Sequence, residues 1–176
     1  VLAPMIENLR QVRQRAEEPE RRGQIERLEA WTRRRWAELT PILEARREEG
    51  RVRECHGDMH RGNIALVGGE PLIFDALEFN PALRWIDTAS ELAFVLMDLE
   101  EAGEVTAARR LLNHYLELGG DYGALQILDF YKVYRALVRA KVLAIRLGQE
   151  DLSPAEVGAN REECARYLAL AESYTR

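Results

Sequence analysis

The stretch HGDMHRGNI, from His56 to Ile64, decides how the fold of this sequence is interpreted. It places Asp58 and Asn63 five residues apart in a loop that contains two glycines and runs into a strand-like segment. Phosphoryl transfer to a hydroxyl uses this spacing, because a carboxylate must receive or orient the hydroxyl proton and an amide oxygen must help to hold Mg²⁺. The stretch therefore predicts Asp58 as a catalytic residue and Asn63 as a metal ligand.

A second metal-binding carboxylate is expected on the strand that follows, and Asp75 stands there, directly after Leu72-Ile73-Phe74. Short β-branched segments at 52–55 and 64–67 predict strands, and Gly68-Gly69 predicts a tight hairpin turn between the second of them and 72–74. The candidate site thus lies on one hairpin and the loop before it.

The rest of the chain has apolar residues at helical spacing. The predicted helices are 5–17, 24–50, 85–101, 105–118, 124–148 and 154–174. Pro19 and Gly23 flank the expected break between the first two, Thr40-Pro41 predicts either a kink or an N-cap, and Ser153 to Glu156 matches a capping box. The predicted fold class is mainly α with a small β-hairpin (α+β).

Length and composition limit the function further. The 176 residues fit a single domain, 1–176, with enough apolar residues for one core. The apolar runs are too short to span a bilayer, the N-terminus has no signal-like segment, and two cysteines make no disulfide framework, so we expect a cytoplasmic protein with no membrane partner. The net charge of −5 argues against nucleic-acid binding.

With His56-Gly57-Asp58, Asn63 and Asp75 in this order, the sequence resembles the aminoglycoside phosphotransferase-like branch of the protein-kinase-like fold. The segment IFDALEFNPALRWIDTASELAFVLMDLE is similar to an uncharacterised bacterial subgroup often fused to a P-loop ATP-binding domain. The resemblance covers the chain as a C-terminal lobe only. It implies that Asp58 is the catalytic base, that Asn63 and Asp75 bind Mg²⁺ and ATP, and that His56 braces the catalytic loop.

Two supporting residues leave alternatives open. Asp87 begins a helical run, so its carboxylate is expected either to cap that helix or, as the resemblance implies, to hydrogen-bond the backbone of the catalytic loop. His60 completes an H-x-D-x-H run with His56 and Asp58, which would suit a metal-dependent hydrolase if Asp75 or His114 also converged on the metal. The loop glycines argue against such convergence.

A basic stripe is predicted on the helix at 124–148, where Lys132, Arg135 and Arg139 fall on one face. One interpretation is a wall of the acceptor site that favours an anionic substrate. The other, which we favour, is pairing with the protein's own acids or with solvent.

The sequence has neither a glycine-rich phosphate loop nor a strand lysine, which a kinase needs. Both lysines follow the motif, and the chain begins at Val1 without Met. We therefore expect a fragment whose N-terminal ATP-covering lobe is absent, with little or no kinase activity alone. A non-catalytic nucleotide- or ligand-binding module is the other alternative. The acceptor is expected to be a small hydroxylated substrate.

Overall fold

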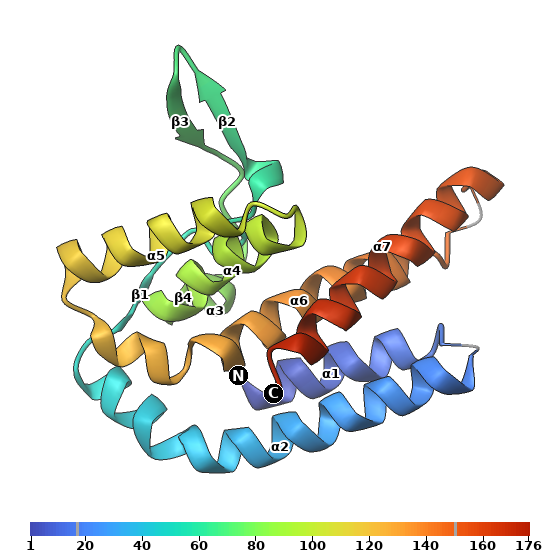
Figure 1. The fold of residues 1–176 in the computed structure, drawn as a ribbon, viewed down its shortest axis with the longest axis horizontal. Coiled ribbons are helices and arrows are strands. Elements are labelled where there is room, and N and C mark those ends of the chain that lie inside the picture. Colours follow the sequence, from blue (N-terminus) through green and yellow to red (C-terminus); the bar gives the residue numbers. More distant parts are fainter. Residues whose placement is uncertain (17, 150) are drawn as a thin grey trace. The chain divides into compact units, whose positions relative to one another are not determined.

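The computed structural model describes residues 1–16, 18–149 and 151–176. These residues divide into two compact units, one formed by Val1–Glu38 with Val133–Arg176 and the other by Leu39–Lys132. The helices dominate both units, and the strands form two small antiparallel sheets, as expected for a mainly α fold with little β structure (Figure 1). Whether the chain is one domain stays a prediction.

The first unit is built from helices alone. It contains α1 (Leu2–Arg13), the first part of α2 (Pro19–Glu48), most of α6 (Leu128–Arg146) and α7 (Pro154–Ser173). Its core holds fully buried side chains from each of these helices: Met5, Leu9, Ile25, Leu28, Leu137, Tyr167 and Leu168. The capping box predicted at Ser153 is present, with the side chains of Ser153 and Glu156 each accepting from the other's backbone N–H.

The predicted break between the first two helices was placed wrongly. Helix α2 already begins at Pro19 and continues through Gly23, so the break precedes Pro19. The first helix was also predicted too long, because α1 ends at Arg13. Residue 17, its predicted end, lies outside the described residues. Pro41 lies inside α2, so the N-cap alternative is wrong. A proline inside a helix removes one hydrogen bond and its ring crowds the preceding turn, which favours the other alternative, a kink.

The second unit carries the candidate loop. After α2 come β1 (Val52–Glu54), the short 3-10 helix η1 (Arg61–Asn63), the hairpin of β2 (Ile64–Val67) and β3 (Glu70–Ile73), α3 (Pro81–Arg84) and β4 (Trp85–Asp87). Helix α4 (Thr88–Glu101), α5 (Val105–Gly119) and η2 (Tyr122–Gln126) follow. Ile64 pairs with Ile73, and Gly68 and Gly69 both have positive φ at the turn, so the hairpin prediction is confirmed.

The helix predicted at 85–101 begins too early. Trp85–Asp87 is strand β4, which pairs with β1 so that Val52 lies opposite Asp87. Pairing between segments so far apart in the sequence overrides the helical spacing of the apolar residues. Helix α4 then starts at Thr88, packs against α5, and is buried on all sides from Ala89 to Asp98 (Figure 1).

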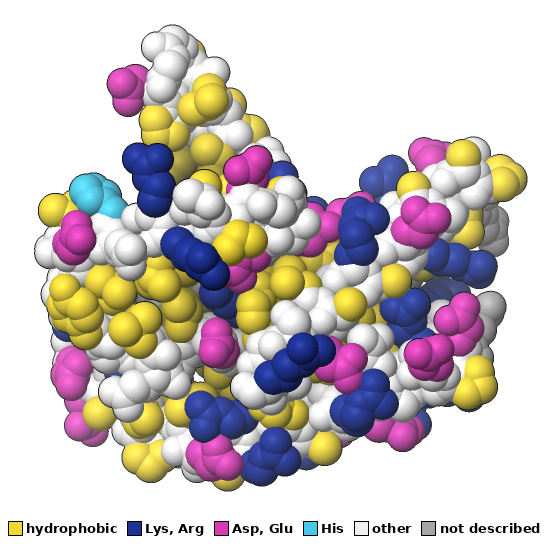
Figure 2. All heavy atoms as spheres, viewed as in Figure 1, with side chains coloured by type: hydrophobic (Ala, Val, Ile, Leu, Met, Phe, Trp, Pro, Cys, Tyr) yellow, Lys and Arg dark blue, Asp and Glu magenta, His cyan; other side chains and the backbone are white. Residues whose placement is uncertain are grey.

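The hairpin of β2 and β3 projects from α4 and α5 (Figure 1) and carries apolar side chains at its surface (Figure 2). Leu66 and Val67 are 77% and 60% exposed, and Leu72, Ile73 and Phe74 are exposed as well. Among the described residues, no helix has the length and apolar character needed to cross a membrane.

Candidate functional site

The loop between β1 and β2 is braced by His56. Its Nδ1 accepts the backbone N–H of Asp58 at 3.3 Å, and its Nε2 lies 2.7 Å from the carbonyl oxygen of Phe74. The two contacts together require the tautomer with hydrogen on Nε2, since only that nitrogen can donate to a carbonyl. His56 therefore ties the start of the loop to the residue directly before Asp75.

Asp58 and Asn63 lie side by side in this loop. The Nδ2 of Asn63 donates to the carbonyl oxygen of Asp58 at 3.0 Å and to its Oδ2 at 3.2 Å. His60 faces the same carboxylate, with its Nε2 3.5 Å from Asp58 Oδ2, while its Nδ1 accepts from the backbone N–H of Gly62. The Asp58 side chain keeps 32% of its surface exposed, so solvent reaches this carboxylate.

Asn63 and Asp75 lie at the same end of the hairpin. The backbone N–H of Phe74 donates to the carbonyl oxygen of Asn63 at 3.0 Å, which continues the ladder beyond the pair Ile64 and Ile73. Asp75, the next residue, is exposed and has a φ of 63°. Non-glycine residues seldom adopt this left-handed conformation, and such strained positions cluster at functional sites.

The oxygens of this pair suit Mg²⁺. Because Asn63 is buried and uses its Nδ2 on Asp58, its Oδ1 is the atom left for a metal. One amide oxygen and one carboxylate make a hard donor set, and Mg²⁺ commonly takes its remaining ligands from water and nucleotide phosphates. The residues present therefore fit a magnesium ion.

Glu91, in the first turn of α4, holds the loop backbone, and sequence reasoning missed it. Its carboxylate is buried and accepts the backbone N–H of His56 at 3.0 Å and that of Gly57 at 3.1 Å. The available signal was a single acid in the otherwise apolar run from Ala89 to Met97, since a buried acid needs hydrogen-bond partners.

Asp98 is a second anchor from the same helix. Its Oδ2 accepts from the backbone N–H of Arg61 at 2.8 Å and from Arg61 Nε at 3.1 Å. Residues seven apart share a helix face, so Glu91 and Asp98 present one face of α4 to the loop. Two buried carboxylates thus fix the loop on both sides of Asp58.

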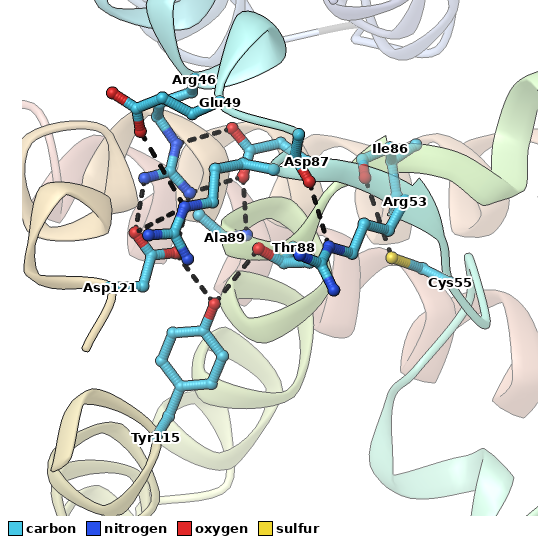
Figure 3. Close-up of polar contacts among 12 residues, drawn as sticks. Arg46, Glu49, Arg53, Cys55, Ile86, Asp87, Thr88, Ala89, Tyr115 and Asp121 are labelled. Carbon is cyan, nitrogen blue, oxygen red and sulfur yellow. Dashed lines mark hydrogen bonds and ion pairs between the residues drawn. The ribbon is translucent and has the colours of Figure 1, made fainter. Parts of the chain in front are cut away.

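Asp87 caps α4 rather than bonding the loop. Its Oδ1 accepts from the backbone N–H of Ala89 at 2.8 Å, and both carboxylate oxygens accept from Arg46, each at 2.8 Å (Figure 3). The cap is therefore the alternative that the structure shows, and Glu91 makes the loop contacts instead.

Arg46 also binds Asp121, at 2.7 and 2.9 Å, and Tyr115 donates its hydroxyl to the same carboxylate at 2.9 Å (Figure 3). Burial by itself would raise the pKa of Asp121, but hydrogen bonds from Arg46 and Tyr115 outweigh it and hold that pKa below its usual value. Burial likewise opposes the charge of Arg46, and its bonds to the two aspartates raise its pKa instead. The three charges form one buried network.

The hydrolase alternative does not fit this geometry. Both ring nitrogens of His56 are used by backbone groups, and His60 uses its Nδ1 on Gly62. Within 1–16, 18–149 and 151–176, no three histidine, cysteine, aspartate or glutamate side chains come together as a metal site. The convergence with Asp75 or His114 that a hydrolase would need is therefore not seen in this part of the chain, as the loop glycines led us to expect.

The basic side chains predicted on one stripe make internal contacts. Lys132 Nζ pairs with Glu100 at 2.7 Å within the second unit. In the first unit, the Arg135 guanidinium lies over the Tyr134 ring, and Arg139 donates to the Tyr167 hydroxyl at 3.3 Å. Lys132 therefore pairs with an acid, as we favoured, whereas these contacts of Arg135 and Arg139 are with tyrosines. Whether these side chains also contact a substrate stays a prediction.

The loop, its two carboxylate anchors and the hairpin hold Asp58, Asn63 and Asp75 as the candidate polar groups of one site, in the order that the resemblance to the phosphotransferases implies. Comparison with known families agrees. The profile of the Phosphotransferase enzyme family (APH) matches residues 1–131, and the chain belongs to this family.

Curated relatives are uncharacterised proteins of Mycobacterium bovis and Mycobacterium tuberculosis, each 39% identical over 108 residues. The match covers 61% of this chain and only 22% of each relative's length. No solved structure matches this chain with significance.

Proposed function

We propose that this chain supplies the acceptor side and the metal side of an ATP-dependent phosphotransferase, which transfers the γ-phosphate to a hydroxyl of a small substrate. The observation that carries the proposal is the contact between Asn63 Nδ2 and Asp58. It fixes the candidate base beside the candidate metal ligand and leaves the amide oxygen of Asn63 for the metal.

In this mechanism Asp58 orients the acceptor hydroxyl and receives its proton, since its carboxylate is partly exposed and held by Asn63 and His60. Asn63 Oδ1 and the Asp75 carboxylate would hold Mg²⁺ together with the nucleotide phosphates. When bound, the metal neutralises the charge on the phosphates. His56 and Glu91 keep the loop backbone in place, so the carboxylates need not reorganise during the reaction.

A partner lobe completes the site in this proposal. The exposed apolar side chains of the hairpin, such as Leu66 and Leu72, support such a partner, because an apolar surface of this kind commonly marks an interaction site (Figure 2). We infer an N-terminal ATP-covering lobe there and a fused P-loop domain in the longer protein, and little activity from this chain alone. The cytoplasmic location stays a prediction.

The test uses the longer protein, with Mg·ATP titrated calorimetrically and turnover followed by ADP release with candidate acceptors. Asp75→Ala should bind Mg·ATP at least tenfold more weakly. Asp58→Asn should keep its affinity for Mg·ATP but lose turnover. Asp151→Asn, an exposed aspartate before α7, is the matched control and should change neither.

Unchanged Mg·ATP affinity in Asp75→Ala would contradict the metal assignment. Full turnover in Asp58→Asn would contradict the role of Asp58. Saturable binding with no turnover in the unmodified longer protein, for any hydroxylated acceptor, would instead support the non-catalytic module.

A further inference from the structure

A small cavity in the first unit has an apolar floor. It measures about 110 Å³ and lies between the end of α1, the start of α2, the end of α6 and the middle of α7. Val12, Ala16, Ala144 and Leu168 line it, and all four are buried. The second unit contributes no residue to it.

The rim of this cavity is strongly positive. Among the residues that the structure describes, three arginines, Arg15, Arg21 and Arg161, line it together with one acid, Glu18. Guanidinium groups bind carboxylates and phosphates through paired hydrogen bonds, so the rim suits an anion.

Two local observations place these arginines. Arg15 lies against Gly148, since a Cβ on that residue would come 3.0 Å from Arg15 Cζ, and glycine therefore leaves room for the guanidinium. Arg21 lies close enough to act on a side chain of the cavity wall: burial raises the pKa of the Cys164 thiol, the charge of Arg21 opposes that rise, and the charge of Glu163 adds to it. The positive charge of Arg21 thus acts on the same side chain that lines the floor.

A buried donor lies near the cavity. Asn160 precedes Cys164 by one turn on α7, and its side-chain Nδ2 has no hydrogen-bond partner among the described residues. Residues four apart share a helix face. Buried amide groups normally have partners, so Asn160 is an unsatisfied donor one turn from Cys164, although it does not itself line the cavity.

The size of the cavity sets the size of the ligand. A cavity of about 150 Å³ holds a benzene molecule in other proteins, so this cavity of about 110 Å³, which is open at its rim, takes up most of one aromatic ring and leaves the remainder of the ligand at the rim. We propose that the first unit binds a small organic anion, with its apolar body on the floor between α1, α6 and α7 and its carboxylate or phosphate head among Arg15, Arg21 and Arg161. This site is separate from the proposed phosphotransfer loop and does not depend on it.

The experiment titrates the intact chain with four probes by calorimetry and NMR: benzoate, phenyl phosphate, benzyl alcohol and inorganic phosphate. We expect saturable binding of the two aromatic anions, with the tighter one identifying the preferred head group. Benzyl alcohol should bind at least tenfold more weakly because it lacks the charge, and inorganic phosphate because it lacks the apolar body. Equal binding of either control probe, or no saturable binding of the aromatic anions, overturns the proposal.

Variants locate the site. Arg161→Gln and Arg21→Gln should each weaken binding about fivefold or more, as expected for one lost charged hydrogen bond. Arg34→Gln, an exposed arginine of α2 away from the cavity, is the matched control and should bind normally. Equal affinity in all three variants would overturn the assignment. Arg161 is exposed, so its replacement should leave the fold intact, and circular dichroism of each variant checks this.

A chemical readout is independent of affinity. In the Cys55→Ser variant Cys164 is the one remaining cysteine, and it lines the cavity. A bound aromatic anion should slow its alkylation by iodoacetamide at saturating ligand, and benzyl alcohol at the same concentration should not. Alkylation at an unchanged rate with saturating benzoate would contradict the proposed position of the apolar body.

Discussion

Arg46 is the residue whose replacement tests the buried network most directly. Its side chain is 4% exposed and binds the carboxylates of Asp87 and Asp121, which are 5% and 3% exposed. In Arg46→Met the chain keeps a long apolar side chain but loses the positive charge between two buried acids. We therefore expect a large loss of stability, caused by the uncompensated charge of the two acids and not by lost packing.

The magnitude follows from the burial of the partners. Removing one member of a buried ion pair typically costs about 3–5 kcal/mol, because the remaining charge is left without compensation. Here two carboxylates remain, and Asp87 also caps α4. Since domains are usually stable by about 5–15 kcal/mol, the variant should fold but unfold at a much lower urea concentration.

The stability of the wild type and that of Arg46→Met should change in opposite directions as pH falls. In the wild type the pKa of Asp121 in the folded state lies below its ordinary value of 3.8. The contribution of Asp121 to stability is therefore complete above pH 3.8 and is lost as pH falls through the lowered pKa. Without Arg46 burial dominates and raises that pKa, so the folded variant takes up protons more readily than the unfolded chain. The stability difference should therefore shrink as pH falls from 7 toward 4.5, by about 1.4 kcal/mol for each unit of pKa difference.

The assay is urea unfolding followed by far-ultraviolet circular dichroism at pH 7, 5.5 and 4.5. Arg33→Met is the matched control, because Arg33 lies in the same helix and pairs with Glu29 at 2.7 Å on the surface. That pair should contribute less than about 1 kcal/mol. A loss below 1 kcal/mol in Arg46→Met, or a difference that does not change with pH, would refute the reasoning.

Four further substitutions are tested by the free energy of unfolding in urea, at Glu91, Gly57, Asp75 and Ser153; each cost below is a decrease in that free energy. Glu91→Gln should cost about 1–3 kcal/mol, because two backbone N–H groups lose a charged acceptor, and an unchanged midpoint would count against this anchor. Gly57→Ala should cost more than about 2 kcal/mol, since φ is 88° and the new Cβ would lie 2.7 Å from the Leu83 carbonyl oxygen; an equal cost in the unhindered Gly68→Ala would contradict the clash. Asp75→Gly should be about 1 kcal/mol more stable than Asp75→Ala, because only glycine adopts this φ freely, and equal stability would argue against strain. Ser153→Ala should cost about 1 kcal/mol through the lost cap, and no change would mean that the cap does not stabilise α7.

The hairpin and the order of the loop residues could be predicted because they are local in sequence. Gly68 and Gly69 adopt the positive φ that a two-residue hairpin turn requires, and Asp58 and Asn63 are five residues apart, within reach of each other in a curled loop. The cap at Ser153 depends on residues only three apart. Short-range geometry of this kind follows from residue types and spacing.

Longer-range features were missed for the opposite reason. The start of α4 was placed at Trp85 because apolar spacing alone does not show that 85–87 pairs with 52–54. Glu91 lies 35 residues after His56, whose backbone it holds, and Arg46 lies 75 residues before Asp121. Acids and arginines occur throughout this sequence, so no spacing rule selects these partners.

The sequence by itself therefore determined the chemistry of the candidate loop and the local elements around it, since turn, cap and motif residues act over a few positions. Only the tertiary structure decided which carboxylates serve the loop and which serve the core. That choice depends on burial: a carboxylate removed from water needs donors close to it, and only folding brings the loop N–H groups to Glu91 and Arg46 to Asp87.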